Sequence, residues 1–246
     1  MLRDIDSLDS HSNLAALKRN VYPGRGLVAG IDKSGKHLVQ ICWIMGRSPN
    51  SRNRVYKRDG GRVYTDLARS DPTADTKLTI YNAMDEARQD FVASNGDQTD
   101  TALKGLQGGV SFIGALNQRT YEPDAPHYTP RITALCTIHP GPHIIISALR
   151  KESAGMGCLH TYYTHDARIP GTWENGTGWC ITTYEGDGNP LPSFQGEPYV
   201  VPLRGDIKEV AKTFWGVLNE QNRVALAAKF IDCQTGKSEV EIINKF

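Results

Sequence analysis

The stretch KHLVQICWIMGRSPNSRNRVY, residues 36–56, determines how the rest of the chain is organised. Its first half, His37 to Met45, is apolar and rich in β-branched and aromatic residues, which predicts a strand buried on both faces. The composition changes at Gly46, after which polar and basic side chains follow, broken only by Pro49. Because proline, asparagine and serine continue a strand poorly, we expect a loop or tight turn at a sheet end.

The loop after Gly46 is basic. A guanidinium group binds phosphate well because its planar fork donates two parallel hydrogen bonds. We therefore expect an anion-binding cradle of guanidinium, hydroxyl and amide groups, made by Arg47, Ser48, Asn50, Ser51, Arg52, Asn53 and Arg54. A solvated basic loop without a ligand is the alternative interpretation of the same composition.

Composition and charge exclude several classes of protein. With 246 residues, 39% of them hydrophobic and 22% charged, the chain resembles an ordinary globular protein with a sizeable core. A net charge of +1 provides no global field for nucleic acid or an anionic membrane, so neither is expected as a partner. The sequence contains no bilayer-length apolar run and no apolar signal core near its N-terminus, which predicts a cytoplasmic protein.

The cysteines indicate neither a disulfide framework nor a metal centre. There are five of them, widely spaced, at Cys42, Cys136, Cys158, Cys180 and Cys233. No C-x-x-C pair and no Cys/His pair has the spacing of a metal site. We expect reduced, buried thiols, no metal and no cofactor.

The fold class follows from the turns and the amphipathic segments. Short turns such as Asp59-Gly60-Gly61 join most predicted strands, which favours antiparallel sheets. Helical periodicity covers Leu103–Ile113 and Asp206–Leu218, with a weaker pattern over residues 5–20. Each strongly amphipathic helix must cover a sheet face, so we expect an α+β fold of two stacked sheets with helices outside. No internal repeat or linker is visible, which predicts one domain.

Several stretches together resemble the stand-alone, archaeal-type IMP cyclohydrolase family. They are YPGRG (22–26), GRSPNSRNR (46–54), YNAM (81–84), YEPDAPHYTPRI (121–132) and, more weakly, TTYEGDGNPLPSFQGEP (182–198). The resemblance implies a four-layer αββα sandwich of antiparallel sheets, of the N-terminal-nucleophile hydrolase-like type. It also implies a single domain over residues 22–246, preceded by an extension of residues 1–21.

The family resemblance implies a reaction that needs no metal or redox cofactor. The small-molecule partner would be a purine ribonucleotide: FAICAR is closed to IMP with loss of water in de novo purine biosynthesis. Such an enzyme needs a phosphate anchor, a proton acceptor for the attacking amide, and donors that stabilise the formyl oxyanion.

The resemblance also assigns roles to particular residues. Glu122 would be the acid/base, Arg131 its electrostatic partner and Tyr81 a donor to the oxyanion. Arg25 and Asp124 would help to bind the nucleotide, and the glycines on either side of Arg25 would let the backbone approach a ligand closely. The alternative for Arg25 is an exposed arginine in a turn. The alternative for Glu122 and Arg131 is a structural ion pair that closes a long loop, and the alternative for Tyr81 is simple packing at a strand rim.

Three other functions remain open at this level. An N-terminal-nucleophile amidohydrolase would need Cys, Ser or Thr as its first residue, but the chain begins at Met1 and no processing site is evident before Cys42. A nucleic-acid-binding module would use the basic loop, against the near-zero net charge. A non-catalytic relative would only bind purine nucleotides. The sequence also leaves a homo-oligomer open.

Overall fold

The computed structural model describes residues 9–73, 76–153, 155–169, 171 and 173–246. The strands of this part of the chain form two antiparallel sheets. The six-stranded sheet has the order β11-β10-β1-β2-β12-β13, with β1 Gly26–Ile31, β2 His37–Met45, β10 Thr177–Thr182, β11 Tyr199–Pro202, β12 Arg223–Asp232 and β13 Ser238–Asn244. The seven-stranded sheet runs from β3 to β9 in chain order, with β3 Arg54–Asp59, β4 Arg62–Leu67, β5 Asn82–Ala87, β6 Asp90–Ser94, β7 Arg131–Thr137, β8 His143–Lys151 and β9 Cys158–Asp166.

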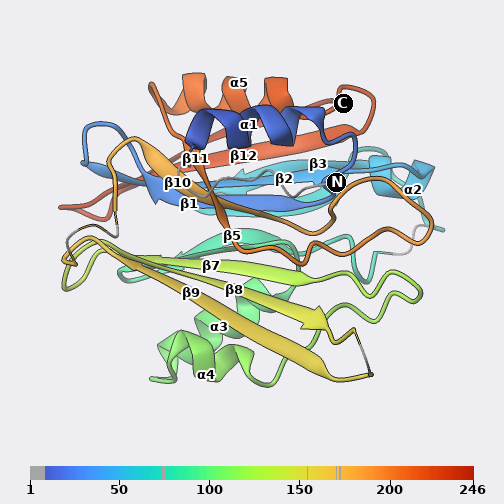
Figure 1. The fold of residues 1–246 in the computed structure, drawn as a ribbon, viewed down its shortest axis with the longest axis horizontal. Coiled ribbons are helices and arrows are strands. Elements are labelled where there is room, and N and C mark those ends of the chain that lie inside the picture. The colour runs from blue at the N-terminus through green and yellow to red at the C-terminus, as the bar shows by residue number, and fades with distance from the viewer. Residues whose placement is uncertain (1–8, 74–75, 154, 170, 172) are drawn as a thin grey trace.

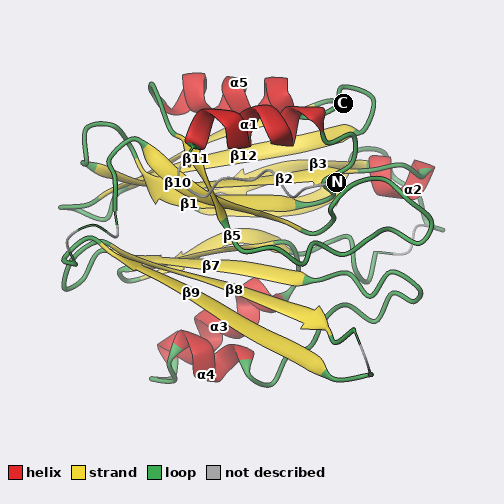
Figure 2. Ribbon diagram, in the orientation of Figure 1, coloured by secondary structure: helices red, strands yellow, loops and turns green. Residues whose placement is uncertain are grey.

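The two sheets lie face to face between two layers of helices (Figures 1 and 2). Helices α1 (Ser10–Arg19) and α5 (Ile207–Val217) cover the outer face of the six-stranded sheet. Helices α3 (Gln98–Gln107) and α4 (Phe112–Leu116) lie on the outer side of the seven-stranded sheet. The expected α+β class with two antiparallel sheets is therefore confirmed, and the helices lie outside both sheets as expected.

Strand β2 is the central element that its sequence predicts. It pairs with β1 on one side and with β12 on the other. Every residue of the strand after His37 is buried, because one face meets the helices and the other meets the second sheet. The strand ends at Met45, and the polar stretch that follows forms a loop with the short helix α2 (Pro49–Arg52).

Besides the short helix α2 in the expected loop, the helices differ from the sequence expectation between Leu103 and Ile113. The pattern over Leu103–Ile113 predicts a single helix, but α3 ends at Gln107 and α4 begins at Phe112. Gly109 between them has a φ of +82°, a left-handed conformation that interrupts a helix, and Ser111 then caps α4. Helix α5 forms where the periodicity predicts it, and a capping box made by Asp206 and Glu209 stabilises its start.

Most of the N-terminal extension lies within the described residues, and residues 1–8 lie outside them. Helix α1 packs beside β11, where the Asn13 Nδ2 atom donates to the Val200 carbonyl oxygen at 2.9 Å. The rest of the extension leads directly into the YPGRG segment. This part of the extension thus belongs to the outer helical layer of the sandwich.

One end of the sandwich gathers the segments that the sequence singles out. Gly26 at the start of β1 lies opposite Trp43 near the end of β2. The YPGRG segment and the basic loop therefore lie at the same end of these two strands. The proline-rich segment of residues 121–130 leads into β7 and is irregular, as expected. Helix α2 marks this end in Figure 1.

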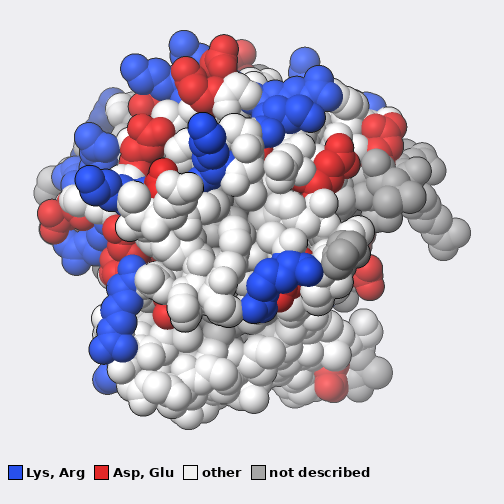
Figure 3. Space-filling view, turned by 90° about the vertical axis from the view of Figure 1, so that its left-hand side faces the viewer, with Lys and Arg blue, Asp and Glu red and all other residues white. Residues whose placement is uncertain are grey.

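Figure 3 shows the opposite end of the molecule. Basic and acidic side chains interleave over its upper half, and its lower half, which belongs to the seven-stranded sheet and its helices, carries few charges. This face therefore offers no extended basic surface of the kind that binds nucleic acid. In the part of the chain that the structure describes, no helix has both the length and the apolar composition needed to cross a membrane.

Candidate active site

A buried ion pair forms the centre of the candidate site. The Arg25 Nη2 atom lies 2.6 Å from the Glu122 Oε2 atom, and only 12% and 3% of the two side chains are exposed. The Arg25 Nη1 atom also donates to the Asn95 carbonyl oxygen at 2.7 Å. Burial alone would lower the pKa of Arg25, but the adjacent Glu122 outweighs it and the pKa is raised well above its usual value.

The glycines on either side of Arg25 allow close packing of aromatic side chains. Gly24 has a φ of +72°, and a Cβ atom there would lie 2.3 Å from the Thr183 Oγ1 atom. A Cβ atom at Gly26 would lie 2.0 Å from the Trp43 ring. Both glycines are thus required by the protein's own packing, which fixes the backbone that carries Arg25.

The Glu122 loop is closed by Asp124. The Asp124 carboxylate accepts a hydrogen bond from the Thr129 backbone amide at 2.7 Å and a second from the Thr129 hydroxyl. The Glu122 amide donates to the Thr129 carbonyl oxygen at 2.9 Å. Both Asp124 oxygens are therefore engaged within the loop, and this geometry does not support the expected role of Asp124 as a nucleotide ligand.

Arg131 differs from its expected role. Its Nη1 atom donates to Asp97 at 2.6 Å and to the Gln98 Oε1 atom at 2.9 Å, and the ion-pair partner of Glu122 is Arg25 instead. Burial lowers the pKa of Arg131, against the opposing effect of Glu122 and Asp97, so the Glu122 charge is felt there without direct contact. Arg131 is better described as a buried neighbour than as a direct partner.

Tyr81 lies beside the ion pair with its hydroxyl free. The residue precedes β5 and is 7% exposed. Among the described residues, its hydroxyl has no hydrogen-bond partner although the atom is buried. Burial raises the pKa of Tyr81, while the nearby Arg25 and Arg54 guanidinium groups moderate the rise. A protonated phenol that lacks a protein partner is available to donate to a ligand.

Arg54 adds a second buried positive charge. Its Nε atom donates to the Ser51 carbonyl oxygen at 2.8 Å and its Nη2 atom to the Met45 carbonyl oxygen at 3.0 Å. No carboxylate in the described part of the chain forms an ion pair with it. Burial lowers the pKa of Arg54, and Arg25 acts in the same direction. Of the buried Arg25 and Arg54 guanidinium groups, only Arg25 is thus paired with a carboxylate among the described residues, and the unbalanced charge of Arg54 favours an anionic ligand.

Arg47 lies at the more exposed side of this cluster. Its guanidinium group stacks over the Tyr22 ring at 5.0 Å and forms an ion pair with Asp187. Its Nη1 atom also donates to the Gly188 carbonyl oxygen at 3.0 Å. The side chain is 36% exposed, so Arg47 is accessible to a ligand in a way that Arg54 is not.

The remaining residues of the expected cradle serve other purposes. Ser48 and Ser51 form the capping box of α2, so their hydroxyl groups bind backbone. The Arg52 guanidinium group donates to the Gly46 carbonyl oxygen at 2.9 Å and to Asn222 at 3.3 Å. The Asn53 side chain binds the backbone of Arg69 through two hydrogen bonds. The expected seven-residue cradle is therefore divided, and only Arg47 and Arg54 reach the cluster around Arg25.

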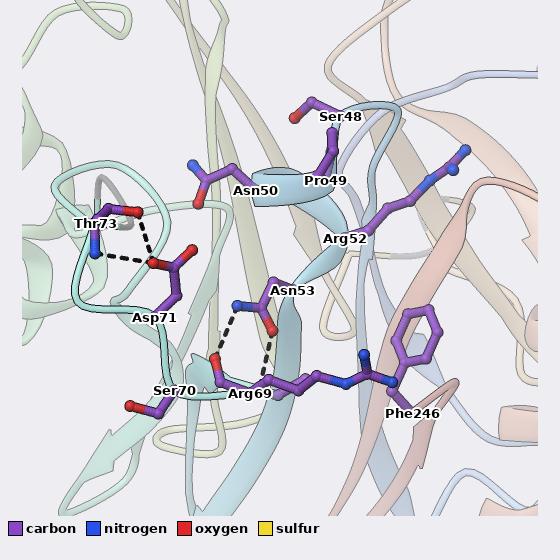
Figure 4. A pocket seen from close by; sticks show the side chains of 11 residues that line it. Ser48, Pro49, Asn50, Arg52, Asn53, Arg69, Ser70, Asp71, Thr73 and Phe246 are labelled. Atoms are coloured by element: carbon purple, nitrogen blue, oxygen red, sulfur yellow. Dashed lines mark hydrogen bonds between the residues drawn. The ribbon is translucent and has the colours of Figure 1, made fainter.

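The outer side of the same loop lines a groove (Figure 4). Its volume is about 830 Å³, and its lining comprises Ser48, Pro49, Asn50, Arg52, Asn53, Ala68, Arg69, Ser70, Asp71, Thr73 and Phe246. In Figure 4 the Asn53 amide lies against the Arg69 backbone, and the Phe246 ring lies near the tip of the Arg69 side chain. None of Arg25, Tyr81 and Glu122 lines this groove. The groups suited to proton transfer belong to the buried cluster instead.

The thiol closest to the basic loop is not a nucleophile. Burial raises the pKa of Cys42 to about 12, so the thiolate is scarcely populated at neutral pH. All five cysteines are free thiols. Across residues 9–246, apart from the few that are not described, no group of three or more His, Cys, Asp or Glu side chains is arranged to hold a metal ion.

Some residues of the cluster could not be recognised in the sequence. In the sequence, Asn95 is part of an Asn-Gly turn. In the structure, its carbonyl oxygen accepts a hydrogen bond from Arg25, and its Oδ1 atom accepts one from the Gln98 side chain at 2.7 Å. Tyr184 lies in the stretch TTYEGDGNP, and its hydroxyl binds Thr129. The sequence points to Tyr184 only through the family-like motif that contains it. A hydrogen bond between residues far apart in the sequence cannot be predicted from the residues next to either of them.

The comparison with protein families identifies one family. A family model described as IMP cyclohydrolase-like protein matches residues 22–237, a range that contains Arg25, Arg54, Tyr81 and Glu122. No curated protein sequence matches the chain. Because the family match spans most of the chain, the chain belongs to the IMP cyclohydrolase-like protein family.

Proposed function

We propose that the protein is an IMP cyclohydrolase, an enzyme that closes FAICAR (5-formamidoimidazole-4-carboxamide ribotide) to IMP with loss of water in de novo purine biosynthesis. The observation that carries the proposal is the buried Arg25–Glu122 ion pair beside the hydroxyl of Tyr81, which has no hydrogen-bond partner in the described part of the chain. Family membership supports a purine nucleotide as substrate. The proposal extends to the fold, which we infer to be of the N-terminal-nucleophile hydrolase-like type.

The reaction makes one bond and breaks another. The carboxamide nitrogen of FAICAR attacks the formyl carbon, and the formyl oxygen becomes the hydroxyl group of a cyclic carbinolamine. That hydroxyl then leaves as water, and loss of the proton from the former formamide nitrogen completes the C=N bond. Holding the carboxamide and formyl groups together supplies part of the rate acceleration.

Glu122 and Tyr81 have complementary roles in these steps. The Glu122 carboxylate accepts the proton of the attacking nitrogen and delivers it to the formyl oxygen, which becomes the hydroxyl group. It then accepts the proton of the former formamide nitrogen and delivers it to the departing hydroxide, so that the released water carries both protons. Such proton transfer accounts for about 10²- to 10⁴-fold in rate. The Tyr81 hydroxyl donates to the formyl oxygen as negative charge develops on it. Arg25 holds Glu122 in place and takes the role that the sequence assigned to Arg131.

The nucleotide phosphate is bound by the arginines that lack a buried carboxylate. Arg54 supplies a buried positive charge and Arg47 a more accessible one, and a phosphate dianion would balance both. Phosphate binding at this point would place the imidazole ring of the substrate within reach of the buried cluster.

The test is conversion of FAICAR by the purified protein. We expect IMP to form at a rate proportional to enzyme concentration, and to form equally well in the presence of EDTA, because the sequence has no ligand cluster. Glu122→Gln, which keeps the shape of the side chain, should lower kcat by about 10²- to 10⁴-fold and leave the affinity for IMP nearly unchanged. A protein that binds IMP tightly but never forms it from FAICAR would be a non-catalytic nucleotide-binding protein, and the proposal would be wrong.

A further inference from the structure

We propose that Tyr184 is a positioning residue that, through Thr129, fixes Glu122 relative to Arg25; this inference rests on the proposed function. Tyr184 and Thr129 are 6% and 0% exposed, and the Tyr184 hydroxyl is hydrogen-bonded to the Thr129 Oγ1 atom. Neither residue reaches the ion pair directly. Their influence passes through the backbone segments that carry the two charged side chains.

On one side, Thr129 holds the Glu122 loop. Its carbonyl oxygen accepts from the Glu122 amide at 2.9 Å, and its amide and hydroxyl both donate to Asp124. The loop lies outside the strands of both sheets, so no β-ladder fixes its position. The hydrogen bonds of Thr129 therefore help to fix the position of Glu122, together with the bond from the Asn95 side chain to the Pro130 carbonyl oxygen in the same loop.

On the other side, Tyr184 belongs to the segment that holds Arg25. The Tyr184 amide donates to the Pro23 carbonyl oxygen at 3.1 Å, and the Thr183 amide donates to the Arg25 carbonyl oxygen at 2.9 Å. The Arg25 amide in turn donates to the Thr183 Oγ1 atom at 3.1 Å. The hydroxyl of Tyr184 is thus a buried side-chain link between the Arg25 segment and the Glu122 loop, in addition to the Arg25–Glu122 ion pair and the hydrogen bonds of His127 to Leu191 and Ser193.

The direction of this hydrogen-bond chain follows from its protons. The Thr129 hydroxyl has one proton, which it gives to the Asp124 carboxylate, so Tyr184 must donate to Thr129. Burial raises the pKa of Tyr184 to about 12, against the lowering effect of Arg25, so the phenol keeps its proton at neutral pH. The chain therefore runs from Tyr184 through Thr129 to Asp124, and each hydroxyl has its partner.

Three single variants and one double variant test the inference. Tyr184→Phe keeps the ring stacked on Tyr22 and removes only the hydroxyl, whereas Thr129→Val removes the middle of the chain and Thr129→Ser retains it. A shift of about 1 Å in a reacting group lowers rates by up to about 100-fold. We expect Tyr184→Phe and Thr129→Val to lower kcat by about 10- to 100-fold with KM for FAICAR within about threefold, and Thr129→Ser to stay near wild type. The double variant should be no slower than Thr129→Val, because both changes break one chain.

Tyr162→Phe is the matched control. Its hydroxyl donates to Asn117 at 3.0 Å, on the helix side of β9, and its loss should leave kcat unchanged. A KM increase at constant kcat in Tyr184→Phe, or a Thr129→Ser variant as slow as Thr129→Val, would overturn the inference.

Hydrogen exchange separates this inference from the proposed function. In Tyr184→Phe, amides of residues 121–130 should exchange about tenfold faster than in wild type and in Tyr162→Phe, with the melting temperature within about 3 °C. This readout needs no turnover, so it decides the matter even if wild type forms no IMP and the proposed function is wrong. Unchanged exchange in that segment would show that Tyr184 does not position the loop.

Discussion

Arg25 and Glu122 are 97 positions apart in the sequence, and the structure brings the Arg25 Nη2 atom to 2.6 Å from the Glu122 Oε2 atom inside the protein. Removing both charges from water costs several kcal/mol, which their mutual attraction only roughly offsets. A buried ion pair of this kind is therefore weak evidence for stability. Its position beside Tyr81 fits the proposed role in proton transfer.

Breaking this pair on one side should destabilise the fold more than removing it altogether. Arg25→Met leaves the Glu122 carboxylate buried and unpaired, which should lower the free energy of unfolding by about 3–5 kcal/mol. The double variant Arg25→Met/Glu122→Met removes both charges and should recover most of that loss, but it should remain inactive. Urea unfolding and FAICAR turnover on the same preparations measure the two effects. A double variant as unstable as the single one would mean that the pair itself stabilises the fold.

Tyr81→Phe should lower activity without lowering stability. Its buried hydroxyl has no partner among the described residues, so removing it deletes no protein hydrogen bond, and a buried unsatisfied polar group is itself unfavourable by about 1–3 kcal/mol. We expect the variant to be at least as stable as wild type. Its kcat should fall by about 10- to 100-fold, less than for Glu122→Gln, because only one hydrogen-bond donor is lost. A destabilised Tyr81→Phe with normal kcat would assign the residue to packing alone.

The fold was largely predictable because its signals are local. The apolar run before Gly46 specifies β2, and the short turns specify antiparallel neighbours. The helical periodicity that includes Leu103 continues beyond the end of α3 at Gln107. Periodicity shows which face of a segment is apolar, but it does not show that Gly109 adopts a left-handed conformation, which interrupts the helix.

The candidate site was predictable only as a set of segments. Sequence motifs identified the YPGRG segment, the basic loop and the Glu122 loop, and these meet at one end of the sandwich. They could not identify which side chain contacts which: Glu122 pairs with Arg25 and not with Arg131, and Ser48 caps a helix. Such pairings depend on how distant segments pack, which no local pattern records.

The lowered pKa of His165 predicts that the protein loses stability in weak acid. Its ring stacks on Trp179 with centroids 3.5 Å apart, and burial, helped by the charge of His143, lowers the pKa of His165 to about 4. The unfolded chain has the ordinary value of about 6.5, so between these values the unfolded state binds more protons. The stabilising contribution is therefore complete above about pH 6.5 and is lost progressively as the pH falls towards 4.

His165→Phe keeps an aromatic ring over Trp179 but does not titrate. Between pH 7 and pH 4.5 its unfolding free energy should fall less than that of wild type, by no more than about 2 kcal/mol because the ring is partly solvated. Urea titrations of both proteins at several pH values measure this difference. Protonation of carboxylates in acid lowers the unfolding free energy of both proteins by the same amount, so it cancels in the comparison. Parallel pH profiles would contradict the assignment.

The proposed phosphate site includes Arg47 and Arg54 but not Arg52 of the same loop. Arg47→Ala and Arg54→Gln should weaken IMP binding by about 10- to 150-fold, which corresponds to about 1.5–3 kcal/mol for a charged hydrogen bond. Arg52→Ala is the matched control, because its guanidinium group donates to Gly46 and Asn222, and it should change IMP binding by less than about threefold. Inosine lacks the phosphate, so none of the three changes should weaken its binding comparably. Calorimetric titration with IMP and with inosine measures both sets. If Arg52→Ala has the largest effect, the phosphate lies in the groove of Figure 4, which Arg52 lines, and not beside Arg54.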